Sequence, residues 1–208
     1  MTEDVFIFPM SFSQQRLWFL DQLEPNSASY NIPAALRLTG RLNVEALKQS
    51  LNEIVARHEV LRTTFATMDE EPVQVVAPMQ EGDLSVVNLE PLPAEERETT
   101  VQRLADEEAQ RPFDLRHGPL LRVTLLRLSD ESHVLLVTMH HIISDGWSMG
   151  IFTNEVVTLY DAFAQNKPSP LPELPIQYAD FAEWQREWLS GETLERQGFK
   201  FVDTIYFC

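Results

Sequence analysis

The stretch LLRVTLLRLSDESHVLLVTMHHIISDGWS, residues 120–148, carries the strongest indication of the fold. It contains two apolar runs, residues 120–128 and 133–139, whose lengths are typical of β-strands. The polar residues 129–132 separate these runs in a turn that is short enough to join neighbouring strands. We therefore expect the two strands to pair as a hairpin.

Predicted helices and strands alternate on both sides of this hairpin. Apolar residues at helical spacing predict helices at residues 11–23, 94–110, 148–163 and 178–189. A further helix is expected after Asn43, a favourable cap, with one apolar face formed by Leu47, Leu51, Ile54 and Val55. The helix at 178–189 is amphipathic and carries Phe181, Trp184 and Trp188. Further strands are predicted at 32–38, 63–66, 73–77 and 84–89, so the mixed order indicates an α/β or α+β layered domain.

Composition excludes several classes of function. The 208 residues include 32 acidic and 16 basic side chains, a formal net charge of −16, whereas a nucleic-acid surface needs clustered Lys and Arg. No stretch has enough consecutive apolar residues to cross a bilayer, and the acidic start, residues 1–4, is unlike a secretory signal. The single cysteine, Cys208, cannot form an internal disulfide or a cysteine metal cluster. These features favour a cytoplasmic protein.

The most informative polar residues lie at the junction between the strand at 133–139 and the next helix. If the strand continues through His140 and His141, their side chains point to opposite faces, so they are poorly placed to bind one metal ion. One histidine can then face a cavity, where histidine commonly serves as a general base or proton relay. The alternative is that both histidines are structural. Asp145 would then cap the helix, and Gly146 would permit a tight turn.

Residues 139–148, MHHIISDGWS, resemble the histidine motif of nonribosomal peptide synthetase condensation domains. The wider superfamily, which includes chloramphenicol acetyltransferase, has the pattern His-His-x-x-x-Asp-Gly. Other blocks resemble further motifs of these domains in the same order, and they read SFSQQRLWFL (11–20), YNIP (30–33), RHEVLRTTF (57–65), PFDL (112–115) and YADFAEW (178–184). The resemblance covers roughly residues 7 to 197.

This resemblance implies a fold and a reaction. The fold is a chloramphenicol-acetyltransferase-like lobe, a mixed sheet with helices packed on it. The reaction is amide bond formation between acyl and aminoacyl thioesters, which are carried on phosphopantetheine arms of carrier proteins. It needs no directly bound cofactor and no metal ion.

The resemblance also implies roles for five residues. His141 would be catalytic, either taking the proton from the attacking amine or hydrogen-bonding to the amine and the tetrahedral intermediate. Gly146 would leave room near the reacting centre and present its backbone amide to the oxyanion. His140 is expected to be structural and to face the other way. Asp145 is expected to be architectural, as an ion-pair partner of Arg62.

Other prominent side chains in these motifs are interpreted as structural. Trp147 is expected to pack, and Arg16 and Trp18 are expected to fix the first helix against the sheet. The remaining histidines are interpreted as structural, loop or strand-edge residues, and they are His58, His117 and His133.

The chain differs from a whole condensation domain in its extent. Residues 1–197 are interpreted as the amino-terminal lobe, and residues 198–208 as an atypical tail, truncated or translated out of frame. The expected partners are carrier proteins and a second lobe or other synthetase domains, and the chain alone is expected to be inactive. The alternatives are a non-catalytic fragment or carrier-protein-binding module, and a self-associating acyltransferase.

Overall fold

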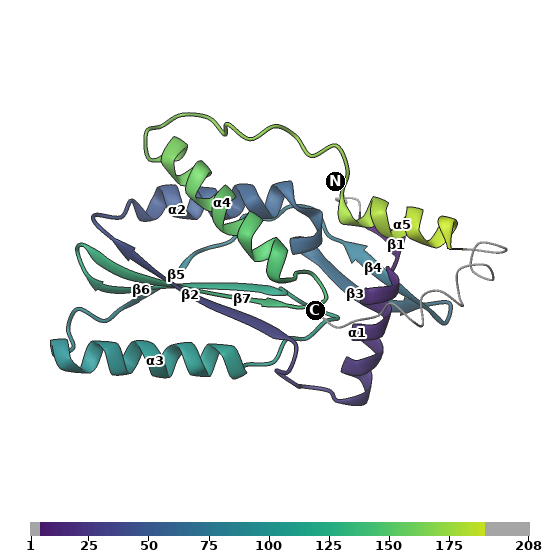
Figure 1. Cartoon of the computed structure of the whole chain (residues 1–208), viewed down its shortest axis with the longest axis horizontal. Coiled ribbons are helices and arrows are strands. Elements are labelled where there is room, and N and C mark those ends of the chain that lie inside the picture. Colours follow the sequence, from purple (N-terminus) through teal and green to yellow (C-terminus); the bar gives the residue numbers. More distant parts are fainter. Residues whose placement is uncertain (1–4, 190–208) are drawn as a thin grey trace.

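Figure 1 shows the computed structural model of the chain, in which residues 5–189 are described. The helices are α1 (Phe12–Leu23), α2 (Val44–Arg57), α3 (Ala94–Gln110), α4 (Gly146–Phe163) and α5 (Tyr178–Trp188), with a short 3-10 helix at Glu59–Arg62. The strands are β1 (Phe6–Pro9), β2 (Asn31–Thr39), β3 (Thr63–Met68), β4 (Glu71–Val76), β5 (Ser85–Asn88), β6 (Leu121–Ser129) and β7 (Ser132–His140). The predicted tail, residues 198–208, lies outside the described residues.

The larger sheet has the strand order β2-β7-β6-β5. The predicted hairpin is confirmed, because β6 and β7 pair antiparallel from Leu121 opposite Met139 to Ser129 opposite Ser132. β2 is antiparallel to β7, and β5 is parallel to β6, so the sheet is mixed as expected. In Figure 1, α2 and α4 lie on one face of this sheet and α3 lies on the other.

A smaller sheet has the order β1-β4-β3 and lies beside the larger one (Figure 1). The predicted hairpin of β3 and β4 is confirmed, and its turn places Asp69 and Glu70 at positive φ, 49° and 68°. Two consecutive residues with positive φ form the tight turn that matches the twist of paired strands.

The core occupies both faces of the larger sheet. β7 is buried along nearly all its length, and its alternate residues belong to different clusters. Leu135, Val137 and Met139 pack in the cluster that includes α2 and α4, whereas Val134 and Leu136 pack in the cluster that includes α3. This alternation determines which way each side chain points where the strand ends.

Side-chain caps begin three of the helices. Ser11 and Gln14 form a capping box at α1, the Asn43 side chain accepts from the Ala46 amide at α2, and Asp145 caps α4. The helix predicted at 178–189 is also found, as α5, but it buries Ala179 and Ala182. Its larger aromatic residues remain partly exposed, and they are Phe181, Trp184 and Trp188.

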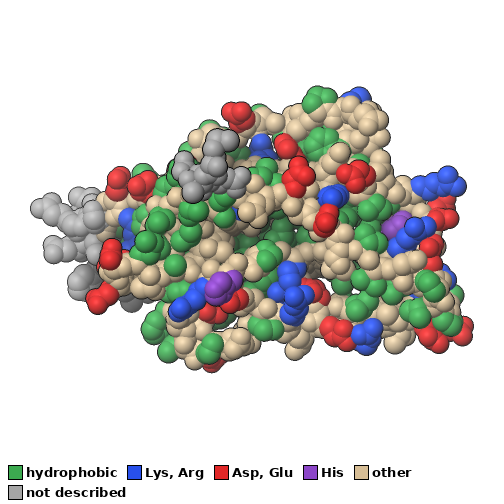
Figure 2. Space-filling view, turned by 180° about the vertical axis from the view of Figure 1, so that it is seen from behind, with side chains coloured by type: hydrophobic (Ala, Val, Ile, Leu, Met, Phe, Trp, Pro, Cys, Tyr) green, Lys and Arg blue, Asp and Glu red, His purple; other side chains and the backbone are tan. Residues whose placement is uncertain are grey.

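The surface of the described part of the chain matches the acidic composition. On the face shown in Figure 2, Lys and Arg side chains are scattered among acidic and hydrophobic ones and form no continuous basic patch among the described residues. None of the helices within residues 5–189 combines the length and the apolar character needed to span a bilayer.

Candidate active site

His140 is the last residue of β7, and His141 follows it directly. The backbone amide of His140 donates to the Leu120 carbonyl oxygen at 3.0 Å, and that of His141 donates to the Tyr30 carbonyl oxygen at 2.8 Å. The extended backbone is therefore held on both sides through the two histidines, and their side chains point to opposite faces. This confirms the orientation predicted from the alternation along the strand.

The His140 side chain is buried, with 2% of the residue exposed, and packs near the rings of Tyr30 and Phe113. Its Nδ1 accepts a hydrogen bond from the Ile142 amide at 3.1 Å. A neutral imidazole carries one proton, so that proton is on Nε2. Burial, followed by the charge of His141, lowers the pKa of His140 from 6.5 to about 4. His140 is therefore neutral near pH 7, and its structural role stays a prediction.

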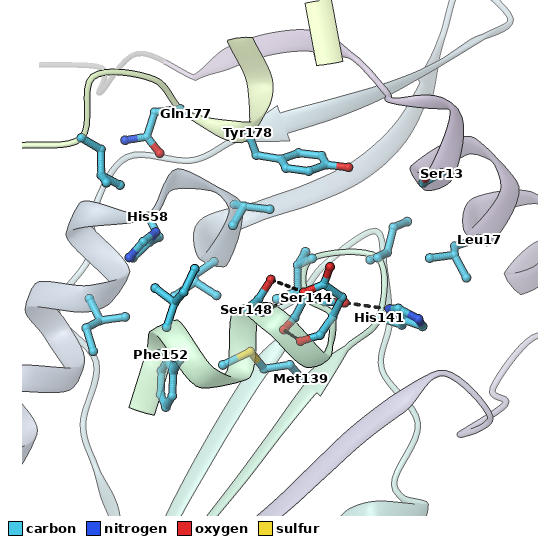
Figure 3. Close-up of a pocket in the computed structure, with 18 of the residues that line it drawn as sticks. Ser13, Leu17, His58, Met139, His141, Ser144, Ser148, Phe152, Gln177 and Tyr178 are labelled. Atoms are coloured by element: carbon cyan, nitrogen blue, oxygen red, sulfur yellow. Dashed lines mark hydrogen bonds between the residues drawn. The ribbon is translucent and has the colours of Figure 1, made fainter. Parts of the chain in front are cut away.

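His141 is exposed and has the opposite tautomer. Its Nδ1 lies 2.7 Å from the Ser144 carbonyl oxygen, which can only accept, so Nδ1 carries the proton. The other ring nitrogen, Nε2, is consequently a hydrogen-bond acceptor when the ring is neutral. His141 lines a cavity of about 390 Å³, and Figure 3 shows its hydrogen bond to Ser144 at one side of that cavity.

Asp145 does not form the predicted ion pair with Arg62. Its Oδ1 accepts from the Ser148 amide at 2.8 Å and from the Ser148 hydroxyl at 2.6 Å, and these bonds hold the pKa of Asp145 below its usual value. Arg62 instead donates to the Ala77 carbonyl oxygen and pairs with Glu59 at 3.2 Å. The expected architectural role of Asp145 therefore takes the alternative form, a cap of α4.

A double-mutant cycle tests this assignment. We expect Asp145→Ala to cost about 1 kcal/mol of unfolding free energy, because the cap is lost, whereas Asp145→Asn should cost a few tenths. Combining Asp145→Ala with Arg62→Ala should give additive losses, since the two residues share no contact. Urea unfolding of the parent chain, the two alanine variants and the double variant measures the coupling energy between Asp145 and Arg62. A coupling energy above about 1 kcal/mol would show that the two side chains do form an ion pair.

Gly146 and Trp147 are the first two residues of α4. A Cβ placed on Gly146 would meet no atom within 4 Å, so the space beside it is open. Trp147 is 82% exposed, so the prediction that it packs is wrong. It is the second helical residue after the cap, and its side chain lies in solvent.

The other motif residues lie on α1 and at the end of α2. Trp18 is buried as expected, whereas Arg16 is exposed and does not fix α1 to the sheet. His58 Nε2 lies 2.6 Å from Glu155, which also accepts from Arg57 at 3.3 Å, and these contacts join α2 to α4. Its structural role fits the prediction, but His58 also lines the cavity, which sequence reasoning missed.

The other histidines lie away from the cavity. His117 is exposed and contacts Asp114 at 2.8 Å, and His133 is buried in β7. Within residues 5–189, no group of three or more His, Cys, Asp or Glu side chains is placed to hold a metal ion.

A family model described as the condensation domain matches residues 6–198. The chain belongs to the condensation-domain family. It is 56% identical over 189 residues to a linear gramicidin synthase protein of Brevibacillus parabrevis, and 46% identical over 186 residues to phosphinothricin tripeptide synthetase PhsC of Streptomyces viridochromogenes. These matches cover 91% and 89% of this chain but only 2% and 17% of the relatives.

Two solved structures share the fold. The starter condensation domain of rhizomide synthetase RzmA matches with a TM-score of 0.85 and 19% identity, over 98% of this chain and 49% of that one. The X-domain from teicoplanin biosynthesis matches with a TM-score of 0.77 and 33% identity, over 93% of this chain and 42% of that one. The predicted layered α/β fold is confirmed, and the chain spans about half of these structures.

Proposed function

We propose that this chain is the amino-terminal, histidine-bearing lobe of a condensation domain that forms amide bonds in nonribosomal peptide synthesis. The observation that carries the proposal is the position of His141 on the cavity wall with its Nδ1 at 2.7 Å from the Ser144 carbonyl oxygen, which makes Nε2 the acceptor of the neutral ring. The substrates are an acyl or aminoacyl donor and an aminoacyl acceptor. Each is held as a thioester on the phosphopantetheine arm of a carrier protein, and no cofactor is bound directly.

The proposed reaction needs one proton acceptor. The neutral amine of the acceptor attacks the thioester carbonyl carbon of the donor, and a C–N bond forms while the carbonyl oxygen becomes an oxyanion. His141 Nε2 takes a proton from the attacking nitrogen. The C–S bond then breaks, the carbonyl re-forms, and the departing thiolate of the donor carrier receives the proton from His141. The products are an amide on the acceptor carrier and a free thiol on the donor carrier.

The residues around His141 have supporting roles in this proposal. The open space beside Gly146 admits the reacting groups, and its backbone amide, at the start of α4, has no partner within the helix and is available to the oxyanion. Asp145 holds the first turn of α4 through Ser148, and His140 anchors the loop inside the core. Arg62 supports the neighbouring 3-10 turn through Glu59.

A hybrid domain tests the function. Residues 6–198 of this chain replace the matched segment of the linear gramicidin synthase protein with which it shares 56% identity. Carrier proteins loaded with donor and acceptor thioesters are then mixed with the hybrid or with the isolated chain, and carrier-bound product is measured by mass spectrometry. We expect amide product from the hybrid and none from the isolated chain, because the second lobe and its carrier contacts are needed. A folded hybrid that binds both carriers but forms no amide would favour a non-catalytic binding module.

A further inference from the structure

The cavity beside His141 is built entirely from described parts of this chain. Its walls come from α1, α2, α4, the loop after β7 and the segment at residues 174–178 (Figure 3). His58 and His141 lie at opposite sides of the view, with Ser148 and Ser144 between them. The cavity is therefore a pocket that extends from the proposed proton acceptor toward the α2–α4 contact.

Apolar side chains dominate the pocket wall. The buried ones include Ile54, Leu61, Ile142, Ile143 and Phe152. A volume of about 390 Å³ is ample for one large side chain, and burying a leucine-sized group in such a wall strengthens binding about 10- to 100-fold. The wall favours an apolar occupant over water.

The charged groups near the pocket are mainly acidic. No lysine or arginine is among its lining residues, whereas Asp145 is, and His58 on the wall contacts the carboxylate of Glu155. Arg57 is near, but its guanidinium pairs with Glu155 and donates to the Pro172 carbonyl oxygen. A carboxylate in the pocket would lose its water without gaining a cation, which is strongly unfavourable.

We propose that this pocket binds the apolar side chain of one of the two carrier-bound residues and rejects acidic side chains. The identity of the ligand rests on the proposed function. The selectivity itself rests on the wall and its charges, so binding can be measured without turnover.

A single substitution at the pocket rim tests the proposal. Ile151 is 43% exposed on α4 and lines the pocket, so arginine there introduces a cation with little effect on the core. Val157 is 55% exposed on the same helix but does not line this pocket, which makes Val157→Arg the matched control. The probes are leucyl and glutamyl amides of aminopantetheine, in which an amide replaces the reactive thioester.

Affinities of the chain for the two probes are measured by titration calorimetry, and amide chemical shifts locate the site. We expect the leucyl probe to bind at least tenfold more tightly than the glutamyl probe, with shifts at pocket residues. Ile151→Arg should reduce this ratio at least tenfold by improving glutamyl binding, and Val157→Arg should leave it unchanged. Equal affinities, binding of neither probe, or equal effects of the two arginines would overturn the proposal. Selective binding together with an inactive hybrid would reject the proposed function alone.

Discussion

Replacing His141 with alanine should lower the rate of amide formation by the hybrid domain about 10²- to 10⁴-fold, the usual contribution of a positioned general base. The cause is loss of Nε2, which is the acceptor nitrogen of the neutral ring because Nδ1 donates to the Ser144 carbonyl oxygen. Because the His141 side chain is exposed, its removal should change the unfolding free energy little. The rate is measured in single turnovers with both carriers loaded, so that product release does not mask the chemical step.

His117→Ala is the matched control for this variant. His117 is also exposed and hydrogen-bonded, to Asp114, but it does not line the cavity. We expect the rate of amide formation by the His117→Ala hybrid to stay within twofold of that of the parent hybrid. A His141→Ala hybrid with a rate as high as that of the control would show that the proton is removed by another group.

Acidification should destabilise the described fold between pH 6.5 and about pH 4, with His140 as a principal cause. In the unfolded chain this histidine has its ordinary pKa of 6.5, whereas burial lowers the pKa of folded His140 to about 4. The unfolded state therefore holds more protons in this window, so stability is fully present above pH 6.5 and is lost as the pH falls. The loss from His140 should reach about 3 kcal/mol at pH 4. Burial also lowers the pKa of His133, which adds a loss of the same sign.

His140→Asn isolates this contribution. The asparagine amide oxygen can accept from the Ile142 amide in place of Nδ1, but the side chain does not titrate. Urea unfolding at a series of pH values should show a shallower loss of stability for this variant than for the parent chain. The matched variant His133→Asn should remove a separate part of the slope. An unchanged slope in the His140→Asn protein would mean that the buried ring is already protonated or remains solvated.

The sequence predicted the strand hairpin and the two histidine orientations because both depend on local periodicity. A β-strand places alternate side chains on opposite faces, and the apolar run up to Met139 is long enough to carry this alternation through His140 and His141. The caps at Asn43 and Asp145 were also predictable, since each side chain bonds an amide three residues later.

The missed features depend on contacts between distant segments or on competition between partners. Arg62 pairs with Glu59, three residues earlier in the same 3-10 turn, and this local partner takes the place of Asp145. The motif pattern does not indicate that Glu59 and Asp145 compete for Arg62. The pocket wall at residues 174–178 and the position of His58 on that wall require α2, α4 and the following segment to be assembled in space.

In the neutral ring of His141, the Ser144 carbonyl oxygen holds the proton on Nδ1 and leaves Nε2 as the acceptor. Nitrogen-15 NMR of the histidine rings, recorded on the chain itself with the His141 ring neutral, distinguishes the two tautomers. We expect a protonated, pyrrole-like Nδ1 and a bare, pyridine-like Nε2 for His141, with the reverse assignment for His140. A neutral His141 ring protonated on Nε2 would contradict the proposed role of this nitrogen, because Nε2 could then accept no proton from the attacking amine.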